Sequence, residues 1–366
     1  MAKHVLHVGP AETRGGMGNT IQRWCNHPPE GWTADYIATH TNGNWLAKFR
    51  AWTRAKRQLI QRMKNNPPDI VHIHGATRAS WLRKRKCIRM ARRFGLPVVY
   101  HVHAGNFDKF LRSWKGIIAK DVNRVLSDPR ITTIALTKRW KKILSKWIPE
   151  PISIVPTALF SHSENTGSSR NRFRFLLPAR PSPVKGHKRA IEMTLELRRR
   201  GYDVSLDLSC VGPKHRDLKH VDSAVIRGHG WLSDQKLDDM MKSSGVLLVP
   251  SEFEGMPSII LEAMGVGLPV VASACCSDIF EKSGEIVPSL DPMIWADHLE
   301  AIISDKQRWE SMSASGPKES EQYSVDAIAK LWERIYNDVI SPIETLRNGH
   351  GPSAMISEES HNASSE

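Results

Sequence analysis

Two glutamates, Glu254 and Glu262, stand eight positions apart in a segment with the pattern of a loop, a helix and a strand. Pro257 suits the first position of the helix, where its missing N–H costs nothing, and Gly267 suits the residue just past the helix end. Glu254 then lies in the loop before the helix and Glu262 in its second turn. A carboxylate accepts two hydrogen bonds, so Glu262 is suited to hold the vicinal hydroxyls of a ribose. The free N–H groups of residues 255–258 would face a sugar or a phosphate.

Two other loops stand out by their composition. A glycine-rich loop with Gly15 and Gly16 follows the first apolar run of the chain. A basic loop with Arg180 and Lys185 follows the first strand-like run of the second half. Parallel sheets bind ligands at the carboxyl ends of their strands, so both glutamates are expected to line one crevice.

These residues are positioned by two series of alternating strands and helices. The first half carries strand-like apolar runs at residues 4–8, 69–74, 97–103, 131–136 and 152–155. The pattern restarts with runs at residues 173–177, 205–211, 225–226, 246–249 and 269–272. Strands that alternate with helices favour a parallel sheet with helices on both faces. The sequence therefore predicts two Rossmann-like α/β domains.

A polar, turn-rich stretch at residues 161–172 separates the two series, as a linker would. We therefore expect an N-terminal domain over residues 1–160 and a C-terminal domain over residues 161–324. Residues 325–340 have apolar side chains at helical spacing and predict a final helix. From residue 341 the chain is polar, which predicts a disordered tail over residues 341–366.

Together these segments resemble the retaining glycosyltransferases of family 4, which have the GT-B fold. The two glutamates match the family's Glu-x7-Glu signature, and residues 15–18 resemble its loop near the donor phosphates. Residues 69–74 resemble its D-V-V-H-x-H strand, and residues 98–105 resemble the strand that ends in the active-site histidine. Arg180 with Lys185 and Gly186 matches the basic pair that binds the diphosphate. These five motifs stand in the family's order and span residues 4–340.

The resemblance implies two Rossmann-like domains that face each other across a central cleft, with the C-terminal helix returning to the N-terminal domain. A nucleotide diphospho-sugar donor would lie in the cleft. The implied catalytic residues are His103, near the reacting carbon, and Glu254, at the sugar hydroxyls. The implied donor-binding residues are Gly15, Gly16, Arg180, Lys185, Gly212, Gly255, Met256, Pro257, Ser258 and Glu262.

The same resemblance gives the two cations a role in catalysis. Arg180 and Lys185 would hold the pyrophosphate and stabilise the negative charge that builds on the departing nucleoside diphosphate. The chain has no Asp-x-Asp, so we expect no metal site and no cofactor besides the nucleotide-sugar co-substrate. Ala179 and residues 156–158 and 256–257 depart from the family pattern, which leaves the donor sugar and base open.

Charge divides the chain into a basic and an acidic part. The net charge is +14, with 29 Lys and Arg against 8 Asp and Glu through Phe160 (+21) and 23 against 30 beyond it (−7). Such asymmetry indicates an acidic partner, either an anionic lipid surface or nucleic acid. A basic surface that is merely solvated is the alternative.

Residues 45–64 are the strongest indication of a partner surface. Their aromatic and apolar side chains recur at helical spacing among basic residues, which is typical of a helix that lies in a membrane interface. An ordinary amphipathic helix covering the first sheet is the alternative. The apolar positions are Trp45, Phe49, Trp52, Leu59 and Met63, and the basic ones include Arg54 and Arg57.

We therefore predict a retaining glycosyltransferase that moves a sugar from a UDP- or GDP-sugar to a saccharide acceptor. The acceptor would be lipid-linked, in cell-envelope polysaccharide or lipopolysaccharide synthesis. A nucleotide-sugar epimerase of the same fold, which needs no acceptor, stays open as an alternative. A basic nucleic-acid-binding protein is a second alternative, disfavoured because the chain has no motif of such proteins.

The expected location is cytoplasmic and peripheral on the inner face of the cell membrane. No run approaches the roughly 18 apolar residues of a spanning helix, and the first residues lack the apolar core of a signal peptide. The five cysteines have no metal-binding spacing, so we expect reduced thiols.

Overall fold

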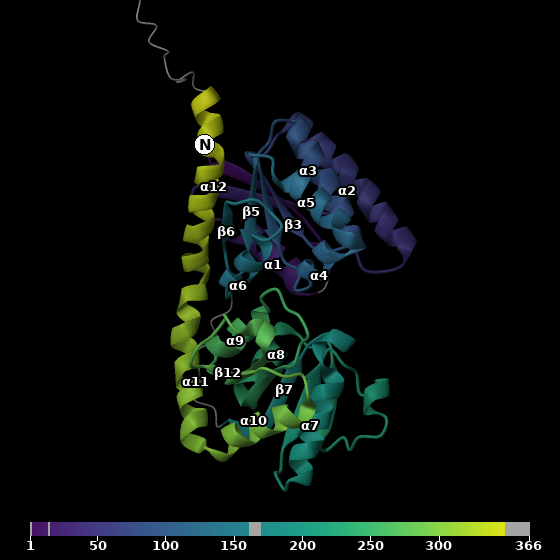
Figure 1. Ribbon diagram of the computed structural model, residues 1–366, viewed down its shortest axis with the longest axis vertical. Helices are drawn as coiled ribbons and strands as arrows, with labels where there is room; N and C mark the ends of the chain where they lie inside the picture. Colours follow the sequence, from purple (N-terminus) through teal and green to yellow (C-terminus); the bar gives the residue numbers. More distant parts are fainter. Residues whose placement is uncertain (1, 14, 161–169, 348–366) are drawn as a thin grey trace, which may run out of the picture.

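The computed structural model of the chain describes residues 2–13, 15–160 and 170–347, which form two lobes stacked along the long axis (Figure 1). Each lobe is built on a six-stranded sheet whose neighbouring strands are all parallel, with helices on both faces. The predicted architecture of two Rossmann-like domains is confirmed. Most of the expected linker, residues 161–169, lies outside the described residues.

The N-terminal lobe has the strand order β2-β1-β3-β4-β5-β6. Its strands are β1 (Lys3–Gly9), β2 (Trp32–Ala38), β3 (Ile70–Gly75), β4 (Val98–Val102), β5 (Ile131–Ala135) and β6 (Ile152–Ile154). Its helices are α1 (Gly16–Asn26), α2 (Trp45–Asn65), α3 (Ala79–Arg93), α4 (Phe107–Arg112), α5 (Ile117–Leu126) and α6 (Lys138–Leu144).

The C-terminal lobe has the strand order β12-β11-β10-β7-β8-β9. Its strands are β7 (Asn171–Pro178), β8 (Ser205–Ser209), β9 (Ile226–Gly230), β10 (Ser244–Val249), β11 (Val270–Ser273) and β12 (Gly284–Val287). Its helices are α7 (His187–Arg199), α8 (Asp234–Ser243), α9 (Ser258–Gly265), α10 (Pro292–Ser304) and α11 (Lys306–Ser320).

Central strands of both sheets are covered on both faces and are therefore buried along their whole length. Every residue of β3, β4 and β10 is buried, which explains why these strands are rich in apolar residues, although β3 and β4 also bury the histidines His72, His74 and His101. The edge strands β2 and β12 are only partly buried. Neither was predicted from the sequence, because a half-exposed edge strand has no continuous apolar run to detect.

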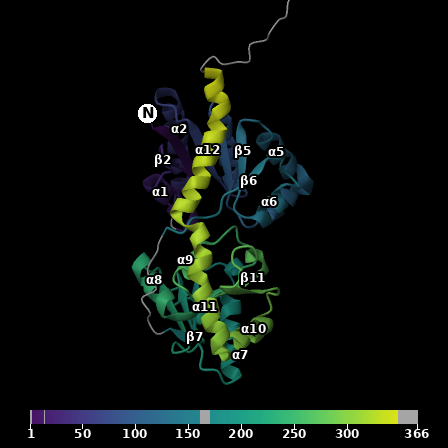
Figure 2. The same ribbon diagram turned by 90° about the vertical axis from the view of Figure 1, so that its left-hand side faces the viewer.

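The last helix, α12 (Val325–Arg347), returns from the C-terminal lobe to the N-terminal one, as predicted. Figure 2 shows α12 lying across one face of the N-terminal lobe and α11 across the C-terminal lobe below it. Ile328, Trp332, Tyr336 and Ile340 are buried on that face. The helix extends to Arg347, beyond residue 341 where a disordered tail was expected. Residues 348–366 lie outside the described part of the chain.

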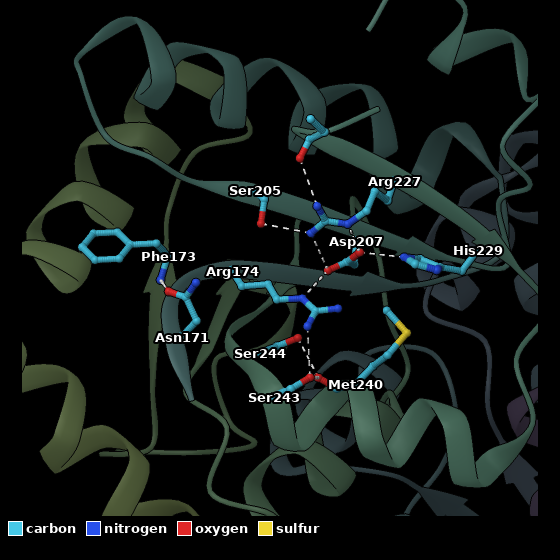
Figure 3. A network of polar contacts seen from close by, with 11 residues as sticks. Asn171, Phe173, Arg174, Ser205, Asp207, Arg227, His229, Met240, Ser243 and Ser244 are labelled. Carbon is cyan, nitrogen blue, oxygen red and sulfur yellow. Dashed lines mark hydrogen bonds and ion pairs between the residues drawn. The ribbon is translucent and has the colours of Figure 1, made fainter. Parts of the chain in front are cut away.

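The sheet of the C-terminal lobe contains a buried ionic network (Figure 3). The carboxylate of Asp207, fully buried on β8, accepts hydrogen bonds from Arg174 Nε on β7 (2.6 Å) and Arg227 Nε on β9 (2.8 Å). It also shares one with His229 Nε2 (2.6 Å). Burial alone would raise the pKa of Asp207, but the hydrogen bonds from Arg227, Arg174 and His229 lower it to about 2.

Two further expectations concern helices and thiols. Among the described residues no helix combines the length and apolarity needed to cross a bilayer. All five cysteines are free thiols, as expected.

Candidate functional site

The carboxyl ends of the two sheets point at each other across a cleft of about 800 Å³. In each sheet the strand order reverses at one place, between β1 and β3 and between β7 and β10. Open α/β sheets bind ligands at such a reversal, because the loops leave the two strands in opposite directions. The loops after β1, β7 and β10 all line the cleft.

Eleven of the twelve residues predicted for catalysis or donor binding line this cleft, although their roles remain predictions. They are Gly15, Gly16, His103, Arg180, Lys185, Glu254, Gly255, Met256, Pro257, Ser258 and Glu262. Gly212 is not among the residues that line it, whereas Ser209 and Cys210 at the end of β8 are. A Cβ atom at Gly212 would meet no atom within 4 Å, so nothing in the packing there requires a glycine.

Glu254 and Lys185 form an ion pair at the floor of the cleft. Lys185 Nζ donates to Glu254 Oε1 at 2.6 Å, and the Glu254 residue is largely buried. Lys185 is brought there by the short 3-10 turn Pro183–Lys185 that leads into α7. In this arrangement each of the two charges is neutralised by the other, so an incoming anion must compete with Glu254 for Lys185.

Helix α9 places Glu262 on the cleft. The helix begins at Ser258, with Pro257 as its N-cap in an extended conformation. The prediction that Pro257 occupies the first helical position is therefore wrong by one residue, because the Pro257 backbone has not yet turned into the helix. Gly267 has a φ of +71° just past the helix end, as predicted. Burial raises the pKa of the Glu262 carboxyl, and the charge of Arg23 only partly offsets that effect.

Arg180 approaches the glycine-rich loop of the opposite lobe. A Cβ atom at Gly15 would lie 3.6 Å from Arg180 Cζ, and the φ of Gly15 is +123°. Gly15 is the N-cap of α1, whose first N–H groups have no partner within the helix. The site thus combines a guanidinium from one lobe with a helix N-terminus from the other, two groups that both attract anions.

The two lobes meet backbone to backbone beside this site. A Cβ atom at Gly105 would lie 2.3 Å from the carbonyl carbon of Glu254, and one at Gly255 would lie 2.3 Å from the His103 oxygen. Both positions require glycine because any side chain would separate the two turns. Trp140 Nε1 donates to the Glu254 carbonyl oxygen at 3.1 Å. The loop that carries Glu254 is therefore held by the N-terminal lobe as well as by its own.

His103 stands at the end of β4 and is half-buried at the cleft. Burial, assisted by the positive charge of Lys84, lowers the pKa of His103 to about 3. The imidazole is therefore neutral at physiological pH. It can donate or accept a hydrogen bond through its ring, but it does not act as a cation.

Several cleft residues were missed by the sequence analysis. Helix α1 presents Gly16, Asn19, Thr20 and Arg23 to the cleft, at the spacing of one helix face. That spacing was a usable signal. Arg23 Nη2 also lies 3.7 Å from Asp234 Oδ2 on α8, so it links the lobes. Trp231 lines the cleft as well, from the loop before α8.

The aromatic residues predicted for a membrane or acceptor surface divide into two groups. Trp45 and Phe49, in the first turns of α2, are 72% and 59% exposed. Trp52 is half-buried, and Leu59 and Met63 are core residues under the sheet. Arg54 and Arg57 are exposed. The second half of α2 is therefore an ordinary covering helix, and only its beginning presents aromatic side chains to solvent.

Comparison with known proteins agrees with this geometry. A family model described as Glycosyltransferase Family 4 matches residues 16–159, and one described as Glycosyl transferases group 1 matches residues 172–305. The chain is 24% identical to the alpha-D-kanosaminyltransferase of Streptomyces kanamyceticus over 81% of this chain and 83% of that enzyme.

Two other similarities concern a second enzyme and a solved structure. The chain is 27% identical to the UDP-Gal:alpha-D-GlcNAc-diphosphoundecaprenol alpha-1,3-galactosyltransferase of Escherichia coli, over 59% of this chain and 60% of that enzyme. Its fold is similar to that of Anabaena HepE in complex with UDP, with a TM-score of 0.68 and 15% identity. The similarity covers 92% of this chain and 100% of that one.

Proposed function

Because this chain belongs to family 4 of the glycosyltransferases, we propose that it transfers a sugar, with retention of configuration, from a nucleotide diphospho-sugar to a saccharide acceptor. The observation that carries the proposal is the convergence of Glu254, Glu262, Arg180 and Lys185 on one interlobe cleft. Two carboxylates suit the hydroxyls of a sugar and a ribose, and two cations suit a diphosphate.

Each residue has a role that follows from its surroundings. Glu262 binds the ribose hydroxyls from the first half of α9. Arg180 and Lys185 bind the diphosphate, with the N-terminus of α1 opposite them. When the diphosphate binds, Lys185 exchanges its bond to Glu254 for one to a phosphate oxygen. Glu254 is then free to accept hydrogen bonds from the donor sugar, next to His103.

Departure of the nucleoside diphosphate develops negative charge between Arg180 and Lys185. Fixed cations stabilise that charge more in the transition state than in the ground state, which lowers the barrier. This is the electrostatic work that a divalent ion does in other transferases, so the reaction is proposed to be metal-independent.

The donor is proposed to be a UDP- or GDP-sugar. The names of one relative and one structural neighbour include UDP, which favours uridine. A thermal-shift panel of UDP, GDP, ADP and CDP tests this, because a ligand that binds only the folded state raises the melting temperature. The base that raises it most identifies the donor nucleotide. A panel without any shift contradicts the assignment of the donor site.

Arg180→Ala tests the assignment of the diphosphate site. We expect kcat to fall by about 10²–10³-fold, the usual loss when one transition-state donor is removed. The measurement is acceptor-dependent release of the nucleoside diphosphate. The matched control is Arg199→Ala, a largely exposed arginine of α7 whose ion pair is with Glu196. If Arg180→Ala keeps activity within about twofold of the wild type, the site is wrongly assigned.

The acceptor dependence of that assay also excludes the other enzyme class. An epimerase converts its nucleotide-sugar without an acceptor, whereas the proposed transferase releases nucleoside diphosphate in proportion to the acceptor supplied. Conversion of UDP-sugar without any acceptor would favour the epimerase.

The acceptor is proposed to be lipid-linked and the enzyme peripheral on an anionic membrane, in the synthesis of cell-envelope glycans. The support is the exposed aromatic beginning of α2, with Trp45 and Phe49, on the lobe that carries the excess of basic residues. Trp114, 76% exposed before α5, adds a third aromatic side chain to that lobe. Aromatic side chains enter the interfacial region of a bilayer, and basic ones are attracted to its lipid headgroups.

A further inference from the structure

Five histidines stand on one face of the N-terminal sheet, the face that α12 covers. His7 lies on β1, His72 and His74 on β3, His101 on β4, and His103 directly after β4. The register pairs His7 with His72 and His74 with His101. The first four are almost fully buried, whereas His103 reaches the cleft. The imidazoles thus form a band that leads from the core of the lobe to the candidate donor site.

Within this band three histidines form a hydrogen-bonded chain, His7–His74–His103. His7 Nδ1 and His74 Nε2 share a hydrogen bond of 2.9 Å, and His74 Nδ1 and His103 Nε2 share another of 2.9 Å. His74 therefore uses both of its ring nitrogens. His72 is outside the chain, because its Nδ1 is bonded to Tyr336 Oη on α12 at 2.7 Å.

The three imidazoles of the chain are neutral at physiological pH. Burial lowers the pKa of His7 and of His103 to about 3, and burial together with the neighbouring histidines places that of His74 well below its ordinary value. A neutral imidazole has one N–H group and one lone pair. Two neutral rings can share a hydrogen bond only if their tautomers are complementary.

This requirement links the three tautomers. If His74 Nδ1 donates, His103 Nε2 must accept, and the proton of His103 is then on Nδ1. If His74 Nδ1 accepts, His103 Nε2 donates and its Nδ1 carries a lone pair. The second bond of His74, to His7, couples a third tautomer to these two: His74 Nδ1 donates only when His7 Nδ1 donates to His74 Nε2, and it accepts only when His7 Nδ1 accepts. Since His103 Nε2 is engaged by His74, Nδ1 is the ring nitrogen left for a ligand in the cleft.

We propose that His74 is a positioning residue: held by His7, it keeps the His103 ring in one tautomer and one orientation, so that a single defined nitrogen meets the ligand. The part of this proposal that concerns turnover rests on the proposed function, in which that ligand is the donor sugar. A ring that offers a fixed donor or a fixed acceptor selects the hydroxyl it binds, and orientation within an active site is worth large factors in rate.

A bound metal ion is the competing explanation of the histidine band. The ligand atoms of His7, His72 and His74 lie within 4.8 Å of one another, as do those of His74, His101 and His103. Neither set contains a carboxylate or a thiolate to offset the charge of a divalent ion, which makes burial of that charge costly. An ion would also take the lone pairs that the 2.9 Å hydrogen bonds use. The hydrogen-bonded chain is therefore the explanation we adopt.

Three substitutions at position 74 test the hydrogen bonds of His74 to His103 and to His7 one at a time. His74→Asn places an amide near the position of Nδ1 and keeps a partner for His103 alone. His74→Gln places it near Nε2 and keeps a partner for His7 alone. His74→Phe fills the same space with no hydrogen-bonding group. We expect Asn, which keeps the bond that orients the His103 ring but loses the bond to His7, to lose less of kcat than Gln and Phe, for which we expect a loss of about 10- to 100-fold with a smaller change in KM. Equal losses in all three variants would overturn the proposal.

Imidazole nitrogen NMR of the full chain gives a readout that does not depend on turnover. In the wild type we expect His103 to show a single neutral tautomer, and in His74→Phe a mixture of both. His7→Phe, which breaks only the far bond, should give the same mixture even if His74→Phe folds poorly. The matched control is His72→Phe, an equally buried histidine on the same strand and face. It should lower the melting temperature and leave the tautomer of His103 unchanged.

Two further results would overturn the proposal. One is a single His103 tautomer in His7→Phe and in His74→Phe. The other is one equivalent of a transition metal in the purified wild type, measured by plasma mass spectrometry and lost in His74→Phe. If the wild type shows no acceptor-dependent turnover, the proposed function fails. The NMR result still decides whether the chain fixes the tautomer.

Discussion

Glu262 illustrates a conflict between binding and stability at a single side chain. Burial raises the pKa of its carboxyl, and the charge of Arg23 and a hydrogen bond with Ser258 offset this only in part, so the charged form is unfavourable in the folded chain. Glu262→Gln removes that charge and keeps the shape. We expect the variant to melt at a higher temperature than the wild type at pH 7.5 and to lose the thermal shift given by nucleoside diphosphates.

The sign of the pH dependence follows from the direction of the pKa shift. The pKa of Glu262 is raised above its ordinary value of 4.5 in the folded state, so the folded chain holds this proton more tightly than the unfolded one. Stability from this group is fully present below pH 4.5 and is lost as the pH rises through the raised value. The melting temperature of Glu262→Gln should therefore exceed that of the wild type by less at pH 5 than at pH 7.5. A control substitution, Glu192→Gln on the outer side of α7, should show neither effect.

Sequence reasoning found four charged residues of the cleft because they lie in, or one helix turn beyond, loops that follow recognisable strands. Arg180, Lys185, Glu254 and Glu262 all lie where the motifs predicted. Arg23 was missed although it shares one face of α1 with other cleft residues, and only its ion pair with Asp234 on α8 of the other lobe lies beyond any local pattern. The Lys185–Glu254 ion pair could not be foreseen either, since their loops follow different strands.

At the scale of elements, Asp207 holds together the three strands β7, β8 and β9. Asp207→Asn would leave Arg174 and Arg227 facing a neutral amide inside the sheet. Breaking a buried ion pair from one side typically costs about 3–5 kcal/mol, and we expect a loss of that size in urea unfolding at pH 7. The matched control is Asp203→Asn, because Asp203 is paired on the surface with Arg198.

The stability that Asp207 provides has a defined pH range. Its pKa is lowered from 3.8 to about 2, so its contribution is present above pH 3.8 and is lost as the pH falls through 2. The difference in the free energy of unfolding between the wild type and Asp207→Asn should stay constant from pH 7 to pH 4 and become smaller below pH 4. A difference that narrows between pH 7 and pH 5 would contradict this assignment.

Helix α12 completes the core of a lobe to which it is not adjacent in sequence. Trp332, buried against the N-terminal sheet, contacts His72 and Tyr336 with its ring. Trp332→Ala should destabilise the N-terminal lobe by about 3–5 kcal/mol through the cavity it leaves. Hydrogen exchange should accelerate in β1 and β3 and remain unchanged in β7 and β8. Arg334→Ala, an exposed neighbour on the same helix, is the control, and equal acceleration in both lobes would contradict the prediction.

The sequence indicated the central strands and missed much of what surrounds them. Strands such as β3 and β10 were found because burial on both faces favours apolar residues, which predominate in β10 and alternate with two buried histidines in β3. Helices α4, α5, α8, α10 and α11 were not assigned, and neither were the edge strands β2 and β12. Helices α5 and α10 have buried apolar side chains at helical spacing, so a local signal was present there, whereas the two edge strands have no continuous apolar run. The tail was placed too early, because α12 continues through polar residues to Arg347.

In the whole molecule, net charge and the exposed aromatic residues of α2 distinguish the N-terminal lobe from the C-terminal lobe. The excess of basic residues lies in the N-terminal lobe, as do Trp45 and Phe49. Replacing Trp45 and Phe49 with serine should reduce flotation with anionic vesicles at low salt. Higher salt should weaken vesicle binding of the wild type and of the double variant, because each cation near the membrane surface contributes about 1 kcal/mol. Leu195→Ser, an exposed apolar residue of the other lobe, is the control. A wild type that never floats would contradict the membrane proposal.

The chain passes between the lobes twice, and the two passages touch. Leu159, where the N-terminal lobe ends, pairs with Ser324 in an isolated β-bridge, and its N–H donates to the Tyr323 oxygen at 2.7 Å. The two connections between the lobes are thus hydrogen-bonded to each other along a single line. We therefore expect any change in the width of the cleft to be a rotation of the two lobes about this line, because two adjacent connections resist sliding of one lobe along the other.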